Sequence, residues 1–338
     1  KPEQFWGVEE DVESVGEFIR LFTSRELRWS SPKYLCGESY GVLRASTLAQ
    51  WLQDRHGMYL HGLVLISGLL SFQTLTPDVG SDLPFTVFLP TLTATAHYHK
   101  KLPPELQNDR DRAMAESRAF ATGEYALALL KGRSIPPEER SRVAASLSRL
   151  TGLDSKLIED QHLRIRPEVF REHLLRAENR ILGRFDSRVT SQDASRRDSP
   201  EFDPSYSNVV GPFSATVNAF LRGEMGYESD HPYRVLTGLP WNYKNFAGRF
   251  VNVSNNLADA MKENPNLRLL ICVGECDLAV PPDSIKYSVD HLPIPDASRQ
   301  NIRWERYESG HMMYLLQKDA EKLRRDIADF IATTGARR

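Results

Sequence analysis

Three side chains of this sequence have the types and the order that nucleophilic catalysis needs. Ser39 lies in GESYG (residues 37–41), between a short apolar stretch and a helical pattern. A glycine-flanked serine in this setting sits on a sharp strand-to-helix turn that exposes its hydroxyl. A serine becomes a nucleophile when a histidine takes its proton and a carboxylate orients that histidine. Asp277 in GECDLAVPP and His311 in YESGHMMY supply both groups, so we expect a Ser39-Asp277-His311 triad.

The elements that must position these three residues are strands followed by tight turns. A predicted strand precedes each residue, and a helical pattern follows Ser39 over residues 42–55. The runs at 60–70 and 267–274 are apolar on both faces, which is typical of central parallel strands. Strands alternating with helices predict a doubly wound, mostly parallel sheet. With its triad in the order Ser, Asp, His, the chain is predicted to be an α/β-hydrolase. The strands are expected at 33–36, 60–70, 267–274 and 302–308, and a last helix at 315–331.

The middle of the chain has a different character. Residues 71–245 are rich in proline and charge and contain helical patterns near 109–130, 137–149 and 167–182, followed by a polar loop at 183–207. We interpret this part as a large, mainly helical cap inserted into the core. The core is then formed by residues 1–70 and 246–338. It begins with a helix over 8–24, and a second helix with Phe246, Phe250 and Met261 on one face precedes the strand 267–274.

Composition excludes several classes of protein. The chain has 338 residues, 41% hydrophobic and 26% charged, with a formal net charge of -2. These values are ordinary for a globular protein and give no bulk attraction to nucleic acid or to an anionic membrane. No apolar run approaches the ~18 residues that span a bilayer. Three cysteines form no disulfide framework and, without a nearby histidine cluster, no metal site is expected.

The residues around the triad resemble the serine carboxypeptidase family. Glutamate before and tyrosine after the nucleophile, as in GESYG, are characteristic, and GECDLAVPP and YESGHMMY match the acid and histidine segments. Between these motifs RWSSPKYLCGESYG, RFDSR followed by FDPSYS, and GYESDHPYRVL resemble the bacterial branch. The resemblance covers nearly the whole chain. It implies a serine-type carboxypeptidase that removes the last residue of a peptide or protein through an acyl-enzyme, without a cofactor.

The resemblance also assigns further roles. Tyr40 would donate its backbone N–H to the oxyanion. Glu38 would bind the free C-terminal carboxylate of the substrate, protonated because a neighbouring carboxylate raises its pKa. Met312, beside the histidine, would line the pocket for the leaving residue, with plain packing as the alternative. Location is implied only by the family and would be periplasmic or secreted.

One family feature is not found in these 338 residues. The family carries an Asn-Gly-Gly-Pro-Gly segment upstream of the nucleophile, which supplies a second oxyanion donor and the partner of its glutamate. The early strands of the family's sheet are also absent from this sequence. The resemblance therefore implies a companion N-terminal segment as a partner, besides the substrate peptide.

Two other functions remain open at this stage. The same triad serves acyltransferases and esterases, and Glu38→Gln would separate these from a carboxypeptidase by sparing ester turnover alone. A non-catalytic binding or regulatory protein on the same fold is the second alternative. The missing oxyanion segment favours that alternative, and the complete triad argues against it.

Overall fold

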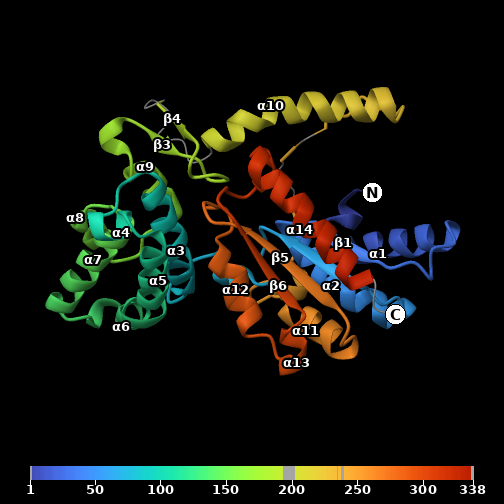
Figure 1. Ribbon diagram of the computed structural model, residues 1–338, viewed down its shortest axis with the longest axis horizontal. Helices are drawn as coiled ribbons and strands as arrows, with labels where there is room; N and C mark the ends of the chain where they lie inside the picture. The colour runs from blue at the N-terminus through green and yellow to red at the C-terminus, as the bar shows by residue number, and fades with distance from the viewer. Residues whose placement is uncertain (1, 193–201, 234, 237–239, 336–338) are drawn as a thin grey trace.

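The computed structural model describes residues 2–192, 202–233, 235–236 and 240–335 of the protein (Figure 1). Its centre is a sheet of four parallel strands in the order β1-β2-β5-β6. Strands from the two ends of the chain lie side by side in this sheet, since β2 pairs directly with β5. All four carboxyl ends therefore lie at one edge of the sheet, which is where ligands bind in open α/β folds. The strands are β1 (Tyr34–Glu38), β2 (Gly62–Ile66), β5 (Arg268–Gly274) and β6 (Ile302–Tyr307).

The two faces of the sheet are covered by different helices. Alternate side chains of a strand point to opposite faces, and β2 follows this rule: Leu63 and Leu65 join one apolar cluster, Val64 and Ile66 another. The first cluster packs against four helices, and the second against the C-terminal helix (Figure 1). The first four are α1 (Val8–Arg25), α2 (Tyr40–His56), α11 (Ser254–Glu263) and α12 (Pro282–Asp290), and the last is α14 (Gln317–Gly335).

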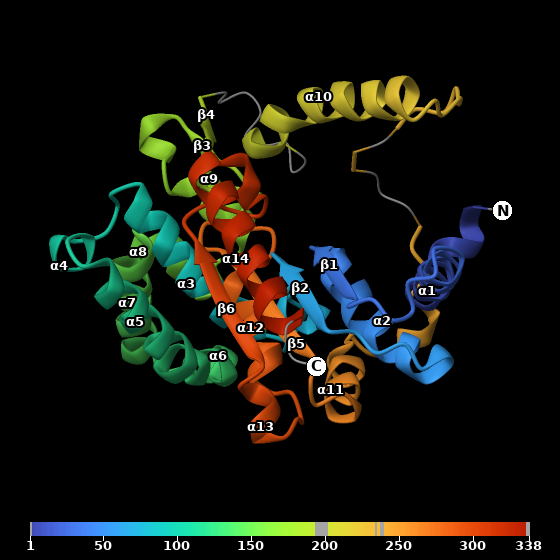
Figure 2. The ribbon, with the colours of Figure 1, turned by 45° about the vertical axis from the view of Figure 1, so that its right-hand side comes forward.

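The helices of the insertion pack around a core of their own. Figures 1 and 2 show them beside the sheet rather than on either face of it. Their apolar cluster contains one residue from the sheet domain, Leu278, directly after Asp277. Ion pairs Arg110–Glu275 and Arg118–Asp283 also join the cap helix α5 to the core. The helices are α3 (Leu83–Tyr98), α4 (Pro104–Gln107), α5 (Arg110–Phe120), α6 (Ala126–Lys131), α7 (Pro137–Thr151), α8 (Ser155–Asp160) and α9 (Pro167–His173).

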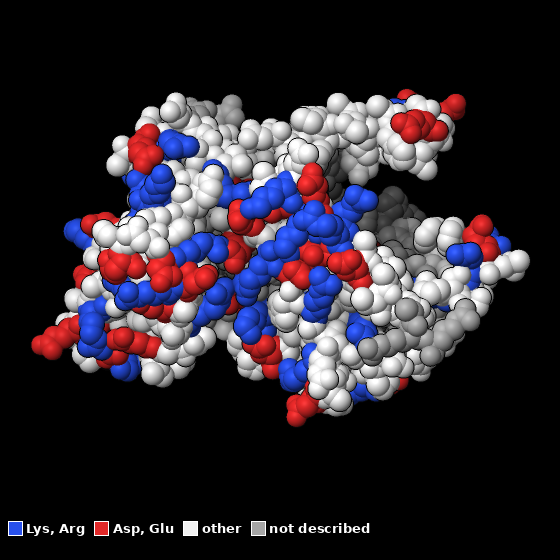
Figure 3. All heavy atoms as spheres, viewed as in Figure 1, with Lys and Arg blue, Asp and Glu red and all other residues white. Residues whose placement is uncertain are grey.

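Helix α10 (Pro204–Ala219) projects away from the rest of the protein (Figures 1 and 2). Only Pro204 and Ser205, at its start, are buried. Figure 3 shows its surface almost free of charged side chains, whereas acidic and basic groups are interspersed over the cap on the same face. A two-stranded hairpin, β3 (Ile181–Leu182) and β4 (Thr190–Ser191), lies near its base. The remaining short helix of the core is α13 (Asp296–Arg299). In the described part of the chain, none of the helices combines the length and the apolar character needed to cross a membrane.

The predicted doubly wound sheet is confirmed, while several element boundaries were wrong. The helix expected from Phe246 begins only at Ser254. Gly248 takes a left-handed φ of 78°, and in the segment after it Asn252 forms an isolated β-bridge with Ser71. In that segment the Val253 N–H bonds to the Leu70 carbonyl at 2.8 Å, outside any helix. The helix expected over 167–182 ends at His173. Helices α3 and α10 were not predicted, and part of the expected loop 183–207 falls outside the described residues.

Candidate active site

The turn at Ser39 is strained in the way a nucleophile requires. Strand β1 ends at Glu38, helix α2 begins at Tyr40, and Ser39 between them has φ 56° and ψ -121°. A non-glycine residue with positive φ persists only where its surroundings hold it. The Ser39 N–H bonds to the Ile66 carbonyl of β2 at 3.0 Å. A Cβ on Gly37 would collide with the Gly41 carbonyl, so the turn requires glycine at residue 37.

The acid and the histidine meet directly, as the sequence predicts. Asp277 is fully buried after β5, and its Oδ2 lies 2.7 Å from Nδ1 of His311. Its other oxygen, Oδ1, accepts the N–H groups of Ala279 and Val280, each at 2.8 Å. The carboxylate is therefore fixed by its own loop before the imidazole reaches it. Such an arrangement selects the imidazole tautomer with hydrogen on Nδ1, which leaves Nε2 free to act as a base.

The electrostatics of His311 follow from this contact. Burial opposes protonation of the imidazole, but the charge of Asp277 and its hydrogen bond outweigh burial and raise the pKa of His311. The charge of Glu38 adds to the same effect. His311 is thus held in an environment that stabilises the imidazolium form. A general base needs that stabilisation when it takes the proton of a serine.

A cap segment, residues 184–188 (RFDSR), holds both loops in place. The His311 N–H donates to the Phe185 carbonyl at 2.6 Å, and the Phe185 ring centroid lies 5.3 Å from that of the imidazole. Asp186 Oδ2 accepts the Gly310 N–H at 3.2 Å, and the Leu278 N–H donates to the Arg184 carbonyl at 3.1 Å. Gly310 cannot carry a Cβ, which would overlap the Phe185 carbonyl. Sequence reasoning gave this segment no role, because its contacts are mostly made by backbone atoms.

Ser39 and His311 follow the two outermost strands, β1 and β6, of the described sheet. Among the residues that the structure describes, no hydrogen bond joins the Ser39 hydroxyl to the imidazole. The loops are nevertheless close, because the Tyr314 hydroxyl, three residues beyond His311, lies 3.1 Å from each oxygen of Glu38. Catalytic hydrogen bonds are often long before substrate binds and tighten in the complex.

The other predicted site residues surround this edge. Glu38 is half-buried, and burial raises the pKa of its carboxyl, against the lowering effects of His311 and of the Tyr314 hydroxyl. Tyr40 is the first residue of α2, where N–H groups have no partner within the helix. Met312 is half-buried beside His311. Tyr314 was not predicted as a site residue, although it is the last residue of the YESGHMMY segment that carries His311.

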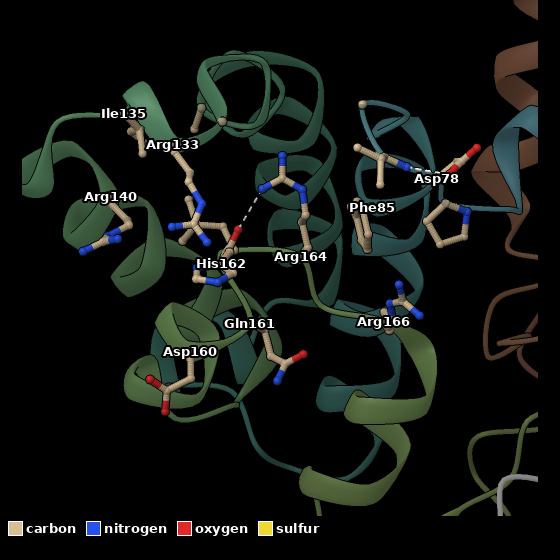
Figure 4. A pocket seen from close by; sticks show the side chains of 16 residues that line it. Asp78, Phe85, Arg133, Ile135, Arg140, Asp160, Gln161, His162, Arg164 and Arg166 are labelled. Carbon is tan, nitrogen blue, oxygen red and sulfur yellow. Dashed lines mark hydrogen bonds between the residues drawn. The ribbon is translucent and has the colours of Figure 1, made fainter.

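A separate cavity of about 780 Å³ lies in the cap, and neither Ser39 nor His311 lines it. Figure 4 shows arginines around it, including Arg133, Arg140 and Arg164. Arg164 is already held by Asp82 through hydrogen bonds of 2.7 and 2.6 Å. The cavity holds no member of the predicted triad, so it is not the candidate active site. In the described ranges no group of three or more His, Cys, Asp or Glu side chains is arranged to bind a metal ion.

Comparison with known proteins gives a distant likeness in structure only. No family model matches the chain, and no curated protein matches it. The crystal structure of VinJ is 16% identical, with 98% of this chain and 74% of that chain covered and a TM-score of 0.38. A Paleococcus ferrophilus monoacylglycerol lipase is 12% identical, with 97% of this chain and 76% of that chain covered and a TM-score of 0.35. Est816, an N-acyl homoserine lactone degrading enzyme, is 12% identical, with 96% of this chain and 76% of that chain covered and a TM-score of 0.30.

Scores of this size support no functional conclusion, and the fold is assigned from the chain's own features. Its parallel strands run in the order β1-β2-β5-β6, with a strained serine turn after the first. An aspartate after β5 meets a histidine after β6. A helical cap is inserted between β2 and β5. The chain therefore has an α/β-hydrolase fold with a large helical cap, although these features do not distinguish a carboxypeptidase from other enzymes of this fold.

Proposed function

We propose that this protein is a serine hydrolase and, more narrowly, a serine-type carboxypeptidase. The observation that supports hydrolase chemistry best is the buried pair formed by Asp277 and His311, 2.7 Å apart. In the proposed mechanism His311 takes the proton of Ser39 as the serine attacks the scissile carbonyl. His311 then returns the proton to the leaving amine, and water repeats the cycle on the acyl-enzyme. The Tyr40 N–H stabilises the oxyanion in both steps.

Preference for a C-terminal peptide bond is proposed from Glu38. Its carboxyl adjoins the nucleophile, and burial raises its pKa. In its protonated form it can donate a hydrogen bond to the free carboxylate of a substrate, which an ionised carboxylate would repel. An ester or an internal peptide bond offers no such anion. Met312, beside His311, is proposed to contact the leaving residue.

A two-part experiment tests the proposal. Labelling with a fluorophosphonate should modify wild-type protein and spare Ser39→Ala, because the reagent needs an activated serine. Release of an amino acid from a blocked dipeptide at pH ~5 should then require its free C-terminal carboxylate. The matched substrate is the same dipeptide as its C-terminal amide, which a carboxypeptidase should leave intact.

The variant Glu38→Ala separates the peptidase from an esterase with the same triad, because it removes the hydrogen-bond donor that a glutamine amide would keep. If Glu38 binds the terminal carboxylate, the variant loses peptide trimming and keeps ester turnover. Equal trimming of the acid and the amide would contradict the carboxypeptidase proposal and leave a general serine hydrolase. Absence of labelling in folded wild-type protein would contradict both.

A further inference from the structure

The carboxyl group of Glu38 is held by one residue of the histidine loop. Tyr314 lies in a short 3₁₀ turn, Met313–Leu315, and its hydroxyl is 3.1 Å from both Oε1 and Oε2 of Glu38. The two residues come from the two edge strands of the described sheet, since Glu38 ends β1 and Tyr314 follows β6. The bond therefore ties the turn that carries the nucleophile to the loop that carries the base.

The direction of this bond is fixed by the chemistry of its partners. Burial, together with the neighbouring Glu38, raises the pKa of the Tyr314 hydroxyl, so it keeps its proton and donates. A hydroxyl has one proton, so it serves one carboxyl oxygen at a time. The other oxygen of Glu38 remains for a different partner. Tyr314 is 39% exposed, so the bond lies at an opening to solvent.

We propose that Tyr314 is a positioning residue for Glu38: its hydroxyl holds one carboxyl oxygen so that the other faces the C-terminal carboxylate of a bound peptide. This inference rests on the proposed carboxypeptidase function. The acid proton of Glu38 stays on the free oxygen, where it is donated to the substrate. Tyr314 touches Glu38 and need not touch the substrate, so it acts through the position of that carboxyl.

The charges around Glu38 define what removal of the hydroxyl does. The imidazole of His311 and the bond from Tyr314 favour the charged carboxylate, whereas burial and the charge of Asp277 disfavour it. Burial raises the pKa of the Cys36 thiol on the same strand, and the charge of Glu38 raises it further. Tyr314→Phe removes one of the two influences that favour ionisation. The pKa of Glu38 should therefore rise further in this variant, while the aromatic ring keeps its packing.

A titration tests the bond without any substrate. The side-chain carboxyl carbons of glutamate are labelled with ¹³C, and the Glu38 resonance is assigned by its loss in Glu38→Gln. Tyr314→Phe should move the Glu38 titration to higher pH. The matched control, Tyr287→Phe, changes another partly exposed tyrosine, on α12, and should leave it unmoved. A Glu38 titration that is the same in wild type and Tyr314→Phe would overturn the inference.

Kinetics with the blocked dipeptide test the positioning role. Loss of a hydrogen bond between neutral groups is worth about two- to tenfold. At a pH where Glu38 is protonated in both proteins, KM for the free acid should therefore rise by about two- to tenfold. The matched ester offers no terminal carboxylate to Glu38, so the substitution should affect its turnover less than it affects the free acid. In the Glu38→Ala background the same tyrosine substitution should have no further effect on KM, since no carboxyl group is left for Tyr314 to position. An equal KM effect in both backgrounds would show a purely structural role for Tyr314 and overturn the inference.

The two proposals fail in different ways. A wild-type protein that is labelled at Ser39 but trims no peptide would overturn the proposed function, and with it the substrate half of this inference. The titration would still decide whether Tyr314 controls Glu38. A titration that does not move, in an enzyme that trims peptides, would overturn this inference alone.

Discussion

Replacement of Asp277 by asparagine should disable the base while leaving the loop in place. The two oxygens of Asp277 have different partners: Oδ1 accepts two backbone N–H groups, from Ala279 and Val280, and Oδ2 faces Nδ1 of His311. An asparagine keeps one oxygen and replaces the other by an NH₂ group. The substitution therefore forces a choice between the two orientations of the amide.

The backbone decides that choice. If the NH₂ group faced the two N–H groups, both would be buried without an acceptor, at about 1–3 kcal/mol each. Even the lower total of about 2 kcal/mol favours the opposite orientation by roughly 30 to 1. The NH₂ group then faces His311 and donates to Nδ1. The imidazole must carry its hydrogen on Nε2, where it cannot accept the proton of Ser39, and this tautomeric change costs about 10⁴ in kcat in serine proteases.

The assay is the rate of fluorophosphonate labelling, followed together with hydrolysis of a simple ester. We expect Asp277→Asn to lose about 10³–10⁴ in both rates and to remain folded. The matched control is Asp326→Asn, which changes a buried aspartate of helix α14 that accepts a hydrogen bond of 2.6 Å from the Tyr307 hydroxyl. Thermal unfolding of both variants separates stability from chemistry. A folded Asp277→Asn protein that is labelled within about tenfold of wild type would refute the reasoning from tautomers.

Three further predictions concern the neighbouring residues. Gly37→Ala should lower the free energy of unfolding by about 1–3 kcal/mol and reduce the labelling rate, because its Cβ would overlap the Gly41 carbonyl. The control is Gly41→Ala, whose Cβ meets open space, and thermal unfolding should show that it is tolerated. Glu38→Gln removes a negative charge that raises the pKa of His311, so the rise of the labelling rate with pH should move to lower pH; a shift to higher pH would contradict the electrostatic assignment. Burial and the charge of Glu38 raise the pKa of the Cys36 thiol, and burial raises the pKa of Cys272 and of Cys276 to about 12. Because Cys36 is exposed and the other two cysteines are buried, a maleimide should modify one thiol in the folded protein and none in Cys36→Ser. If the predicted companion segment adds a strand to β1, its presence should slow that modification.

Much of the core could be predicted because its signals are local. The strands around Val64 and Ile271 are short apolar runs bounded by turn residues, and a parallel sheet buries such strands on both faces. The turn at Ser39 can also be recognised from neighbouring residues. The backbone requires glycine at Gly37, and Gly41 lies in open space. From these elements the meeting of Asp277 and His311 follows, because the carboxyl ends of parallel strands share one edge.

The cap was harder to predict for physical reasons. Helix α3 is buried on nearly all sides and contains Pro90, so it lacks the polar face that makes a helix recognisable in a sequence. The RFDSR segment contacts the histidine loop through the Phe185 carbonyl and the Asp186 carboxylate. These contacts join residues more than a hundred positions apart in the sequence. The pairing of Glu38 with Tyr314 joins two loops in the same way. The resemblance places the partner of Glu38 in a segment outside this sequence, and in the described part of the chain the Glu38 carboxyl accepts a hydrogen bond from the Tyr314 hydroxyl.

The charges of Glu38 and His311 couple the protonation of the two groups. The charge of Glu38 raises the pKa of His311, and the charge of His311 lowers that of Glu38, so protonation of one group makes protonation of the other harder. The proposed peptide trimming needs a protonated Glu38 together with a neutral His311. This form holds the same number of protons as the ion pair, in which Glu38 is ionised and His311 is protonated. The two forms therefore interconvert by moving one proton, and a bell-shaped pH profile would report values that belong to the pair. A substrate carboxylate that accepts a hydrogen bond from Glu38 favours the form with the proton on Glu38. In that form the imidazole is the free base that Ser39 requires, so recognition of the chain end would also prepare the nucleophile.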